Sequence, residues 1–202
     1  YSAGYLILYA YTRAGVNHNT TLLKNNQDSL VQNGDSIVGE GWYKELVLIS
    51  YPEKTILVVG GSLGAKGINE AMSEGLQQLA DNNMQLIWQT GKTYFETAKQ
   101  QTAAFESKNI RAVDFITRMD LAYAFADVVI SRAGAGAISE LCIVQKPSIL
   151  VPLLTAAEDH QTKNAQTLVD KNAARMVKDN EMKEKLQPYA QAPISVLETS
   201  SI

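Results

Sequence analysis

From Lys54 onward, short apolar runs alternate with longer amphipathic stretches, and few folds accommodate such a pattern. The runs have the length of strands and carry apolar residues at consecutive positions, which is typical of strands buried on both faces. Strands separated by helices of this length are joined by right-handed crossovers. The pattern therefore predicts an α/β fold, a Rossmann-like doubly wound parallel sheet with helices on both faces.

The boundaries of the elements follow from the same alternation. Strands are expected at residues 55–59, 85–89, 110–113, 127–131, 148–151 and 174–177. Helices are expected at residues 66–81, 93–106, 119–125, 137–144 and 161–171, with a last one near 181–189. Ligands of such sheets bind at the carboxyl ends of the strands, so a site is expected in the loops that follow the strands.

Residues 1–53 behave differently. Polar residues crowd positions 17–33 without a sustained period, and three glycines follow within residues 34–41. We expect this segment to be the remnant of a preceding domain with a connector, and the alternative is a disordered or misassigned leader. The chain begins at Tyr1 without a methionine, so we expect a fragment of a longer protein.

Composition and charge argue against several classes of function. The net charge of -3 gives no electrostatic case for binding nucleic acid. Cys142 is the only cysteine, which excludes disulfides, and we expect it in the core on the inner face of its helix. The two histidines, His18 and His160, lie far apart in the sequence, which argues against a zinc centre. The single cysteine and the distant histidines fit a reducing cytoplasm. No apolar run approaches the ~20 residues that span a bilayer, and we expect no leader at the start of the chain.

A glycine-rich turn lies between the apolar run 128–130 and the helix expected at 137–144. It reads Gly134-Ala135-Gly136, and Glu140 follows within the helix. Glycines let a ligand approach the backbone, and the first N–H groups of a helix attract an anion. A carboxylate at Glu140 can accept hydrogen bonds from the vicinal hydroxyls of a ribose. A tight strand-to-helix turn with a solvated acid fits the segment equally well.

A second loop of the same kind follows the strand expected at 55–59. It reads Gly60-Gly61-Ser62-Leu63-Gly64-Ala65, which is neither the dinucleotide fingerprint G-x-G-x-x-G nor a P-loop. Alone it is weak evidence, since glycine turns open many helices of Rossmann-like folds. Two such loops in one sheet suit a ligand with a diphosphate in the middle and a group at each end.

A series of motifs, taken in order, resembles the carboxyl-terminal domain of the MurG family, bacterial glycosyltransferases of family 28 with the GT-B fold. The motifs lie at residues 60–65, 88–91, 114–116, 119, 126–135, 139–140 and 158–165. The resemblance implies that residues 54–202 are a UDP-GlcNAc-binding domain and residues 1–53 a remnant of the acceptor domain with a connector. It also implies an inverting transfer of N-acetylglucosamine from UDP-GlcNAc to the C4 hydroxyl of lipid I, which forms lipid II in peptidoglycan synthesis.

The resemblance assigns roles around the nucleoside. The backbone of Phe115 and Ile116 would read the edge of the uracil through its N–H and C=O groups, and Met119 would line the same pocket. Glu140 would hold the ribose hydroxyls, as its place in the helix already suggests.

The resemblance also assigns roles around the diphosphate and the sugar. Residues of the glycine loops would approach the diphosphate, namely Gly61, Ser62, Gly64, Gly134 and Ala135. The GlcNAc hydroxyls, including the one at C4, would be bound by His160, Gln161 and Asn164. Gln161 and Asn164 are three apart and therefore share one face of a helix.

Each role has a simpler structural alternative. Phe115 and Met119 are four apart and also fit core positions. Gln161 and Asn164 also fit an ordinary helix start. Arg132 fits either a contact with a phosphate or a salt bridge with a neighbouring acid.

The resemblance stops short in residues 1–53. The family's glycine-rich loop with a histidine and its Gln-Glu-Gln-Asn segment do not occur in this chain. Residues 1–4 and 13–16 resemble the middle of that domain, but Asn17-His18-Asn19 stands where the acceptor motif should follow. We therefore assign no catalytic base and expect the chain to hold the donor half of a transferase.

No Asp-x-Asp motif occurs, so the resemblance implies neither a metal nor a cofactor. The implied partners are UDP-GlcNAc and UDP, lipid I, and the cytoplasmic face of the bacterial plasma membrane, reached peripherally through the amino-terminal part. The fragment itself is expected to be soluble. The alternatives are another GT-B enzyme that makes glycolipids from a UDP-sugar, a UDP-GlcNAc epimerase, or a binding module without catalysis.

Overall fold

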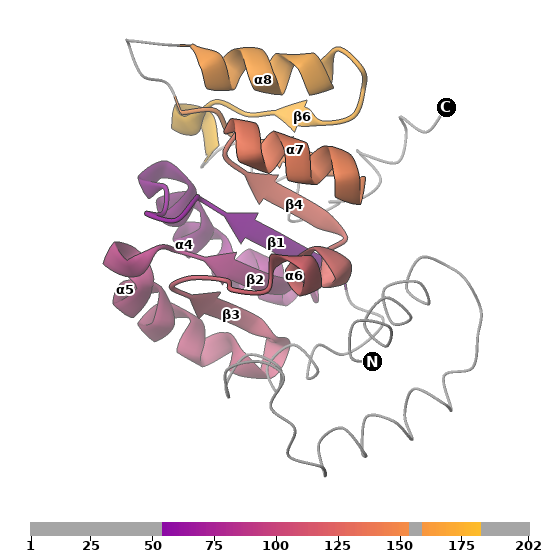
Figure 1. Ribbon diagram of the computed structural model, residues 1–202. Helices are drawn as coiled ribbons and strands as arrows, with labels where there is room; N and C mark the ends of the chain where they lie inside the picture. The colour runs from indigo at the N-terminus through magenta and orange to yellow at the C-terminus, as the bar shows by residue number, and fades with distance from the viewer. Residues whose placement is uncertain (1–53, 154–158, 183–202) are drawn as a thin grey trace, which may run out of the picture. The chain divides into compact units, whose positions relative to one another are not determined.

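A computed structural model of the chain describes residues 54–153 and 159–182. These residues form one six-stranded sheet in the order β3-β2-β1-β4-β5-β6, with every neighbouring pair parallel (Figure 1). The strands are β1 (Thr55–Val59), β2 (Gln85–Gln89), β3 (Ile110–Val113), β4 (Val128–Ser131), β5 (Ser148–Leu150) and β6 (Arg175–Met176). The α/β prediction of a Rossmann-like, doubly wound parallel sheet is confirmed. The proposed boundary near residue 53 falls at the edge of the described residues and stays a prediction.

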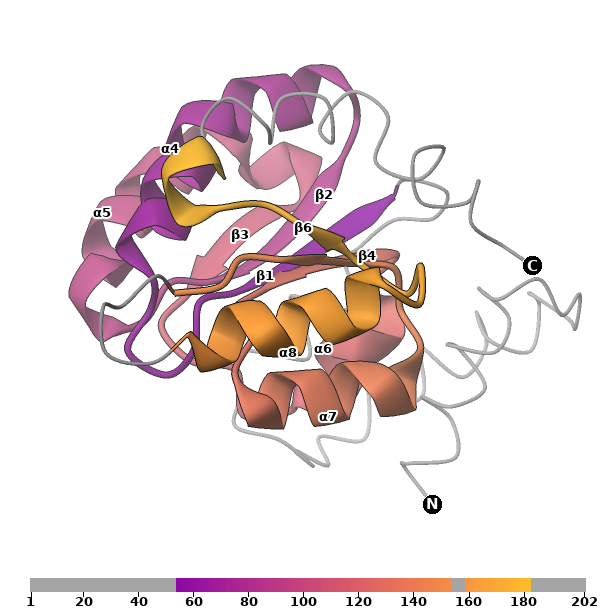
Figure 2. The ribbon, with the colours of Figure 1, turned by 90° about the horizontal axis from the view of Figure 1, so that it is seen from above.

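Helices cover both faces of the sheet. They are α4 (Lys66–Asp81), α5 (Lys92–Thr102), α6 (Met119–Phe125), α7 (Ala135–Val144) and α8 (His160–Val169), with short 3-10 turns η1 (Ala103–Lys108) and η2 (Asp179–Glu181). Figure 2 shows α4 and α5 on one face and α6, α7 and α8 on the other. The crossovers change face after β3, so the sheet is wound in both directions from β1, as doubly wound folds are.

Each strand is buried because both of its faces are covered. On the face of α4, alternate side chains such as Val58, Trp88 and Ile130 join one apolar cluster with the helix. The intervening residues, such as Leu57 and Val129, are 0% exposed and point to the opposite face. Full burial of side chains of this size contributes about 1.5–3 kcal/mol each, which makes this core the main source of stability.

The observed helix boundaries differ from the expected ones in a few places. The helix expected at 93–106 changes to a 3-10 turn after Thr102 and ends at Asn109, whose φ of 56° is a left-handed conformation that asparagine tolerates. Helix α7 begins at Ala135, two residues earlier than expected, because Gly134 is already the extended N-cap residue. Most of the helix expected near 181–189 lies outside the described residues.

Cys142 is exposed, so its expected place in the core is wrong. In α7 only Leu141 is buried. The helix carries apolar residues on all sides, and its sequence period therefore could not indicate which side faces the sheet.

Candidate functional site

The strand ends are aligned across the sheet, which brings the following loops to one edge. The last residues of β3, β2, β1, β4 and β5 are paired with one another in the register of the sheet. In that order they are Val113, Gln89, Val59, Ser131 and Leu150. In Figure 1 the arrows of the labelled strands point to the same side. Both glycine loops, the 114–118 loop and residues 151–153 after β5 therefore lie at the carboxyl edge, where ligands of such sheets bind.

The loop after β1 has a fixed shape. Gly61 has a φ of 88° and Gly64 a φ of 79°, values that side chains rarely adopt. The Gly64 N–H donates to the Gly61 carbonyl at 3.1 Å and closes a tight turn. The turn projects Ser62 and Leu63 outward, and Leu63 is 88% exposed. The loop therefore presents its backbone and Ser62 at the sheet edge.

A buried network holds this turn against the end of β2. The Trp88 Nε1–H donates to Asn69 Oδ1 at 3.1 Å, and Asn69 Nδ2 donates to the Thr90 carbonyl at 2.9 Å. A Cβ added to Gly64 would lie 2.0 Å from the same carbonyl oxygen. The strand, the first turn of α4 and the loop are thus fixed as one unit.

Gln89, at the end of β2, connects two parts of the predicted site. Gln89 is 3% exposed, and its side-chain Nε2 donates to the Gly61 carbonyl at 3.0 Å. Its Oε1 accepts from the Ile116 N–H at 2.9 Å. The Ile116 N–H, expected to read the uracil, is therefore already bound within the protein, whereas the Ile116 carbonyl accepts no hydrogen bond from the described residues.

Phe115 is 46% exposed, so its ring does not lie in the core, which was the alternative to a place in the binding site. Its N–H is bound by the Asp114 carboxylate at 2.8 Å. Ile116 is buried, and Met119 is half-buried as the first residue of α6. The aromatic ring thus stands at the edge of the sheet beside the buried backbone of the loop.

The second glycine loop leaves the start of α7 open. Gly134 is its N-cap residue, and no side chain of the described residues caps the first N–H groups. Within the described ranges, no atom lies within 4 Å of a Cβ added to Gly134, Gly136 or Gly61. The first N–H groups of a helix that lacks a side-chain cap form a suitable site for an anion.

Glu140 lies on α7 and is exposed. Its Oε2 accepts a hydrogen bond of 2.8 Å from the hydroxyl of Tyr123 on α6. Burial, first, and then the neighbouring carboxylate raise the pKa of Tyr123 well above its ordinary value of 10.0. The hydroxyl is therefore a proton donor throughout the neutral range. Sequence reasoning missed this partner of Glu140, because α6 and α7 meet only in the fold.

Arg132, directly after β4, forms a salt bridge with a neighbouring acid, Asp179. The sequence had left open either such a salt bridge or a contact with a phosphate. The Arg132 Nη1 lies 2.6 Å from Asp179 Oδ1 and donates to the carbonyls of Val151 and Pro152 at 3.2 and 3.4 Å. A Cβ added to Gly67 would lie 2.7 Å from both Asp179 oxygens, so the carboxylate also packs on the first turn of α4. A contact between Arg132 and a phosphate stays a prediction.

The start of α8 is attached to the same edge. Gln161 Oε1 accepts from the Leu153 N–H at 3.0 Å, and Asn164 Nδ2 donates to the Ala133 carbonyl at 3.1 Å. Both side chains therefore point to the sheet edge from one face of α8, the shared face that their spacing predicted. Each keeps amide groups that bind no other described residue. His160 is exposed at the first position of the helix.

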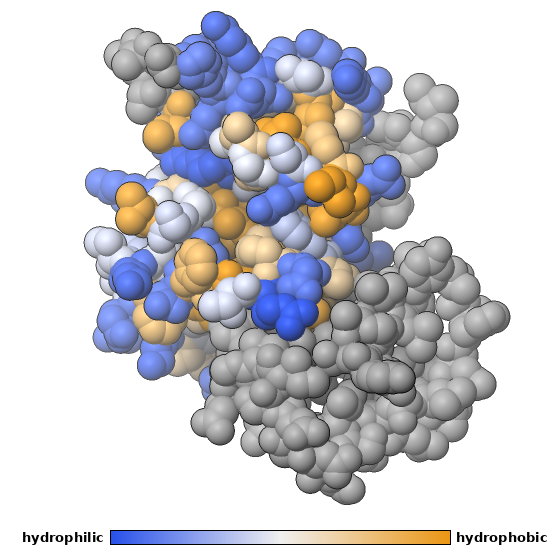
Figure 3. Space-filling model, in the orientation of Figure 1, coloured by the Kyte–Doolittle hydropathy of each residue, from blue (hydrophilic) through white to orange (hydrophobic). Residues whose placement is uncertain are grey.

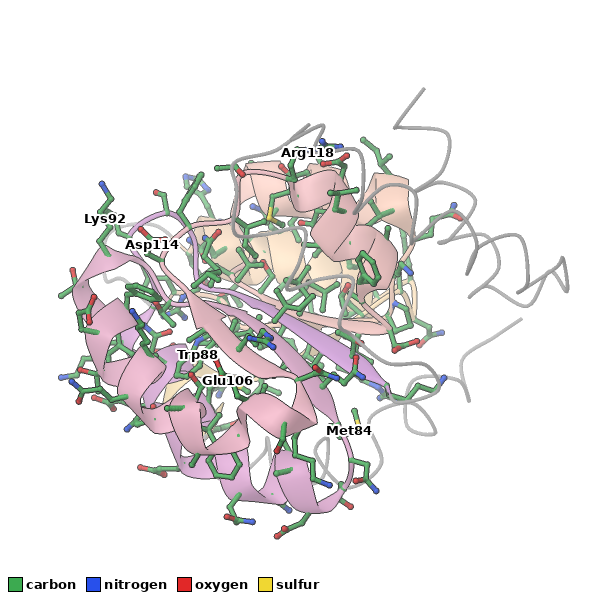
Figure 4. The ribbon with its side chains drawn as sticks, turned by 90° about the horizontal axis from the view of Figure 1, so that it is seen from below. Met84, Trp88, Lys92, Glu106, Asp114 and Arg118 are labelled. Carbon is green, nitrogen blue, oxygen red and sulfur yellow. The ribbon has the colours of Figure 1, made fainter. Side chains whose placement is uncertain are left out.

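Apolar side chains surround the site. Leu63, Phe115 and Leu153 are exposed and lie in the loops after β1, β3 and β5. Figure 3 shows separate apolar patches among polar surface on the side where these loops lie. In Figure 4 Lys92 and Asp114 lie together at this end, and Met84 lies at the opposite end of the sheet.

Two other kinds of functional feature, a metal-binding cluster and a membrane-spanning helix, are not found among the described residues. Within residues 54–153 and 159–182, no group of three His, Cys, Asp or Glu side chains is arranged to hold a metal ion. No helix in those ranges has the length and apolar character needed to cross a membrane. What the edge offers is backbone N–H groups, the exposed carboxylate of Glu140 and several amides, which together suit a ligand with a diphosphate and many hydroxyls.

Comparison with known sequences points to one family. The family described as the glycosyltransferase family 28 C-terminal domain matches residues 55–192. A protein of Bacteroides thetaiotaomicron is 54% identical over 140 residues, which are 68% of this chain and 38% of that protein. One of Phocaeicola vulgatus is 52% identical over 148 residues, 73% of this chain and 39% of that protein. Both are named UDP-N-acetylglucosamine--N-acetylmuramyl-(pentapeptide) pyrophosphoryl-undecaprenol N-acetylglucosamine transferase.

Solved structures agree with this result. The crystal structure of Acinetobacter baumannii MurG is similar with a TM-score of 0.62 and 32% identity, over 77% of this chain and 44% of that one. A glycotransferase of kitacinnamycin has a TM-score of 0.52 at 22% identity, over 72% of this chain and 37% of that one, which shows a shared fold alone. The chain spans about two fifths of the length of the curated relatives described above.

Proposed function

The chain belongs to glycosyltransferase family 28 and contains its C-terminal domain, and on this premise we propose that it binds UDP-GlcNAc as the donor half of a transferase. The observation that carries the proposal is the meeting of two open glycine loops and the Glu140 carboxylate at one edge of the sheet. A diphosphate matches the loop N–H groups, and a ribose matches the carboxylate.

The parts of the donor would be divided among the loops. The uracil would lie at Phe115 and Ile116, with the Ile116 carbonyl as the reading group, because its N–H already binds Gln89. The diphosphate would lie between the loops after β1 and β4. The sugar would reach Gln161 and Asn164, whose remaining amide groups can bind its hydroxyls.

In the complete protein the reaction would be the one for which the relatives are named, transfer of N-acetylglucosamine to a lipid-linked N-acetylmuramyl-pentapeptide. The acceptor hydroxyl would attack the anomeric carbon, invert it and release UDP. The loop N–H groups and the helix dipoles would stabilise the charge that develops on the departing diphosphate. No acceptor base is assigned within the described residues.

The lipid-linked acceptor in the relatives' name also motivates the proposed location. An undecaprenyl chain stays in a bilayer, so the transfer would take place at a membrane surface. We assign it to the cytoplasmic face of the bacterial plasma membrane, with contact through the amino-terminal part of the complete protein.

Calorimetric titration of the 202-residue chain tests donor binding. UDP and UDP-GlcNAc should bind, and UDP-galactose should bind more weakly. Glu140→Ala should weaken UDP by about 100-fold or more, because two hydrogen bonds to a charged group are lost. Glu96→Ala, at an exposed position on α5, serves as the control and should bind as the original chain does. The absence of binding at millimolar UDP, or indifference to Glu140→Ala, would contradict the proposal.

A second candidate is a nucleotide-sugar-binding module without catalysis, because the contacts described at the carboxyl edge suit donor binding alone. The two are separated by a longer form that includes the natural amino-terminal part. Transfer of N-acetylglucosamine to lipid I by that form supports the transferase. A folded, donor-binding form that transfers no sugar supports the module.

A further inference from the structure

Glu140 is poorly suited to hold a ribose without help from another residue. It is exposed on α7 and its side chain has several rotatable bonds. Ordering a glutamate side chain costs up to about 1.5–2 kcal/mol of conformational entropy. A carboxylate that is already held in place binds more tightly, because part of this cost is met before the ligand arrives.

Tyr123 has the properties of a holding group. It is 5% exposed and lies on α6, whose Leu121, Ala122 and Phe125 are also buried. Its hydroxyl donates to Glu140 Oε2 at 2.8 Å, the length of a good O–H to carboxylate bond. The ring is fixed by packing, so the hydroxyl is at a defined position relative to α7.

The bond also determines which acceptor positions stay open. A carboxylate has about four lone-pair positions. Tyr123 occupies one on Oε2, which leaves Oε1 and the second position on Oε2 for other donors. Two vicinal hydroxyls can use these positions at the same time.

We propose that Tyr123 is a positioning residue for nucleotide binding, which holds the Glu140 carboxylate in the orientation that accepts both ribose hydroxyls. The inference rests on the proposed function, since it requires Glu140 to face a ribose. Tyr123 makes no contact with the ligand itself. Its removal therefore weakens only ligands that carry the hydroxyls.

The test compares UDP with 2',3'-dideoxy-UDP by calorimetry on the 202-residue chain and its Tyr123→Phe variant. The original chain should prefer UDP. Tyr123→Phe should weaken UDP by about 5-fold, the equivalent of one hydrogen bond, and leave the dideoxy nucleotide unchanged. Tyr94→Phe is the matched control, because it removes a hydroxyl bonded to Ser73 at 2.8 Å and should change neither affinity.

Glu140→Asp is a second measurement that does not depend on the folding of Tyr123→Phe, because its position is exposed. The shorter side chain keeps the charge but withdraws the carboxylate from Tyr123 and from the ribose alike, so the preference for UDP over the dideoxy nucleotide should fall by at least as much as in Tyr123→Phe, about 5-fold or more.

The outcomes separate the inference from the proposed function. An original chain that does not prefer UDP over dideoxy-UDP overturns the ribose role of Glu140 itself. A chain that does prefer UDP, and whose Tyr123→Phe variant keeps or increases that preference, overturns the inference alone. Equal weakening of both nucleotides by Tyr123→Phe also overturns it, because that result indicates a general structural role.

Discussion

At the scale of single residues, two glycines of the loop after β1 are required for different structural reasons. Gly61 needs its φ of 88°, but a Cβ there would meet no described atom within 4 Å. Gly64 has both a φ of 79° and the Thr90 carbonyl oxygen 2.0 Å from an added Cβ. Gly64 is therefore the position at which a side chain would displace the loop.

Gly64→Ala should destabilise the protein by more than about 3 kcal/mol, because backbone strain and a clash with backbone add together. Urea unfolding measures this change. Gly75→Ala is the control, since Gly75 lies within α4 with open space around it. It should stabilise by about 0.5–1 kcal/mol through helix propensity. Equal effects of the two changes would contradict the packing of the loop on Thr90.

The raised pKa of the Tyr123 hydroxyl predicts that the stability of the fold depends on pH in the alkaline range. This pKa is raised in the folded state above the ordinary 10.0, so the folded chain keeps a proton that the unfolded chain loses. This contribution is complete below pH 10.0 and decreases as pH rises above that value. Thermal unfolding between about pH 9 and 11 should therefore show a steeper loss in the original chain than in Tyr123→Phe, and parallel curves would contradict the assignment.

The positions of single residues could be predicted from the sequence better than their contacts with other residues. The place of Glu140 at the carboxyl edge followed from its spacing after a strand and a glycine turn. Tyr123 as its partner did not, because the contact depends on how α6 packs beside α7. The ion pair of Arg132 was one of two alternatives, and only the fold brings Asp179 to it from 47 positions away in the sequence.

At the scale of elements, the end of β2 organises the site. Gln89 binds the loop after β1 through Gly61 and the loop after β3 through Ile116. Its motif, Trp88 to Gly91, matched the family in sequence without a role being assigned. Its position as the last residue of an expected strand, at the edge where ligands bind, was a signal that could have indicated a role for Gln89.

Gln89→Leu should cost about 1–3 kcal/mol, because the half-buried Gly61 carbonyl and the buried Ile116 N–H lose their partner. It should also weaken UDP, since both loops lose their connection. Chemical unfolding and calorimetry measure the two effects. Gln100→Leu, at an exposed position of α5, should change neither. If Gln89→Leu alters stability but leaves UDP affinity intact, the link between the loops is not part of binding.

Element boundaries were predicted well where an apolar run or a glycine marked them. The observed β1, β2, β3, α4 and α6 have the expected bounds. Cys142 was misplaced, because a helix that is apolar on all sides gives no period from which to infer its buried face.

At the scale of the whole described unit, the alternation of runs was enough to predict a parallel α/β sheet. The strand order was not predicted, since crossovers of similar length can lead to either side of β1. The Arg132 to Asp179 pair shows one consequence of the order observed. It connects the end of β4 in the middle of the sheet to η2, which follows the edge strand β6.

Asp179→Asn should destabilise the fold by about 2 kcal/mol, because the Arg132 side chain is only 12% exposed and would lose its counter-charge. The figure is below that for a fully buried pair, since Asp179 is 30% exposed. Lys66→Gln is the control, as Lys66 is 88% exposed and pairs with Glu70 at 3.8 Å. It should cost less than about 0.5 kcal/mol. Urea unfolding that ranks the two variants in the opposite order would contradict the buried role of the pair.

The central claim is that a UDP-sugar binds at the carboxyl edge of this sheet, and backbone amide shifts in NMR spectra test it most directly. On addition of UDP-GlcNAc, shifts should be concentrated in residues 61–65, 115–119, 134–140 and 160–164. The turns at 82–84 and 109, at the opposite ends of β2 and β3, should stay unchanged. Shifts concentrated at those turns, or no shifts at millimolar ligand, would contradict the account.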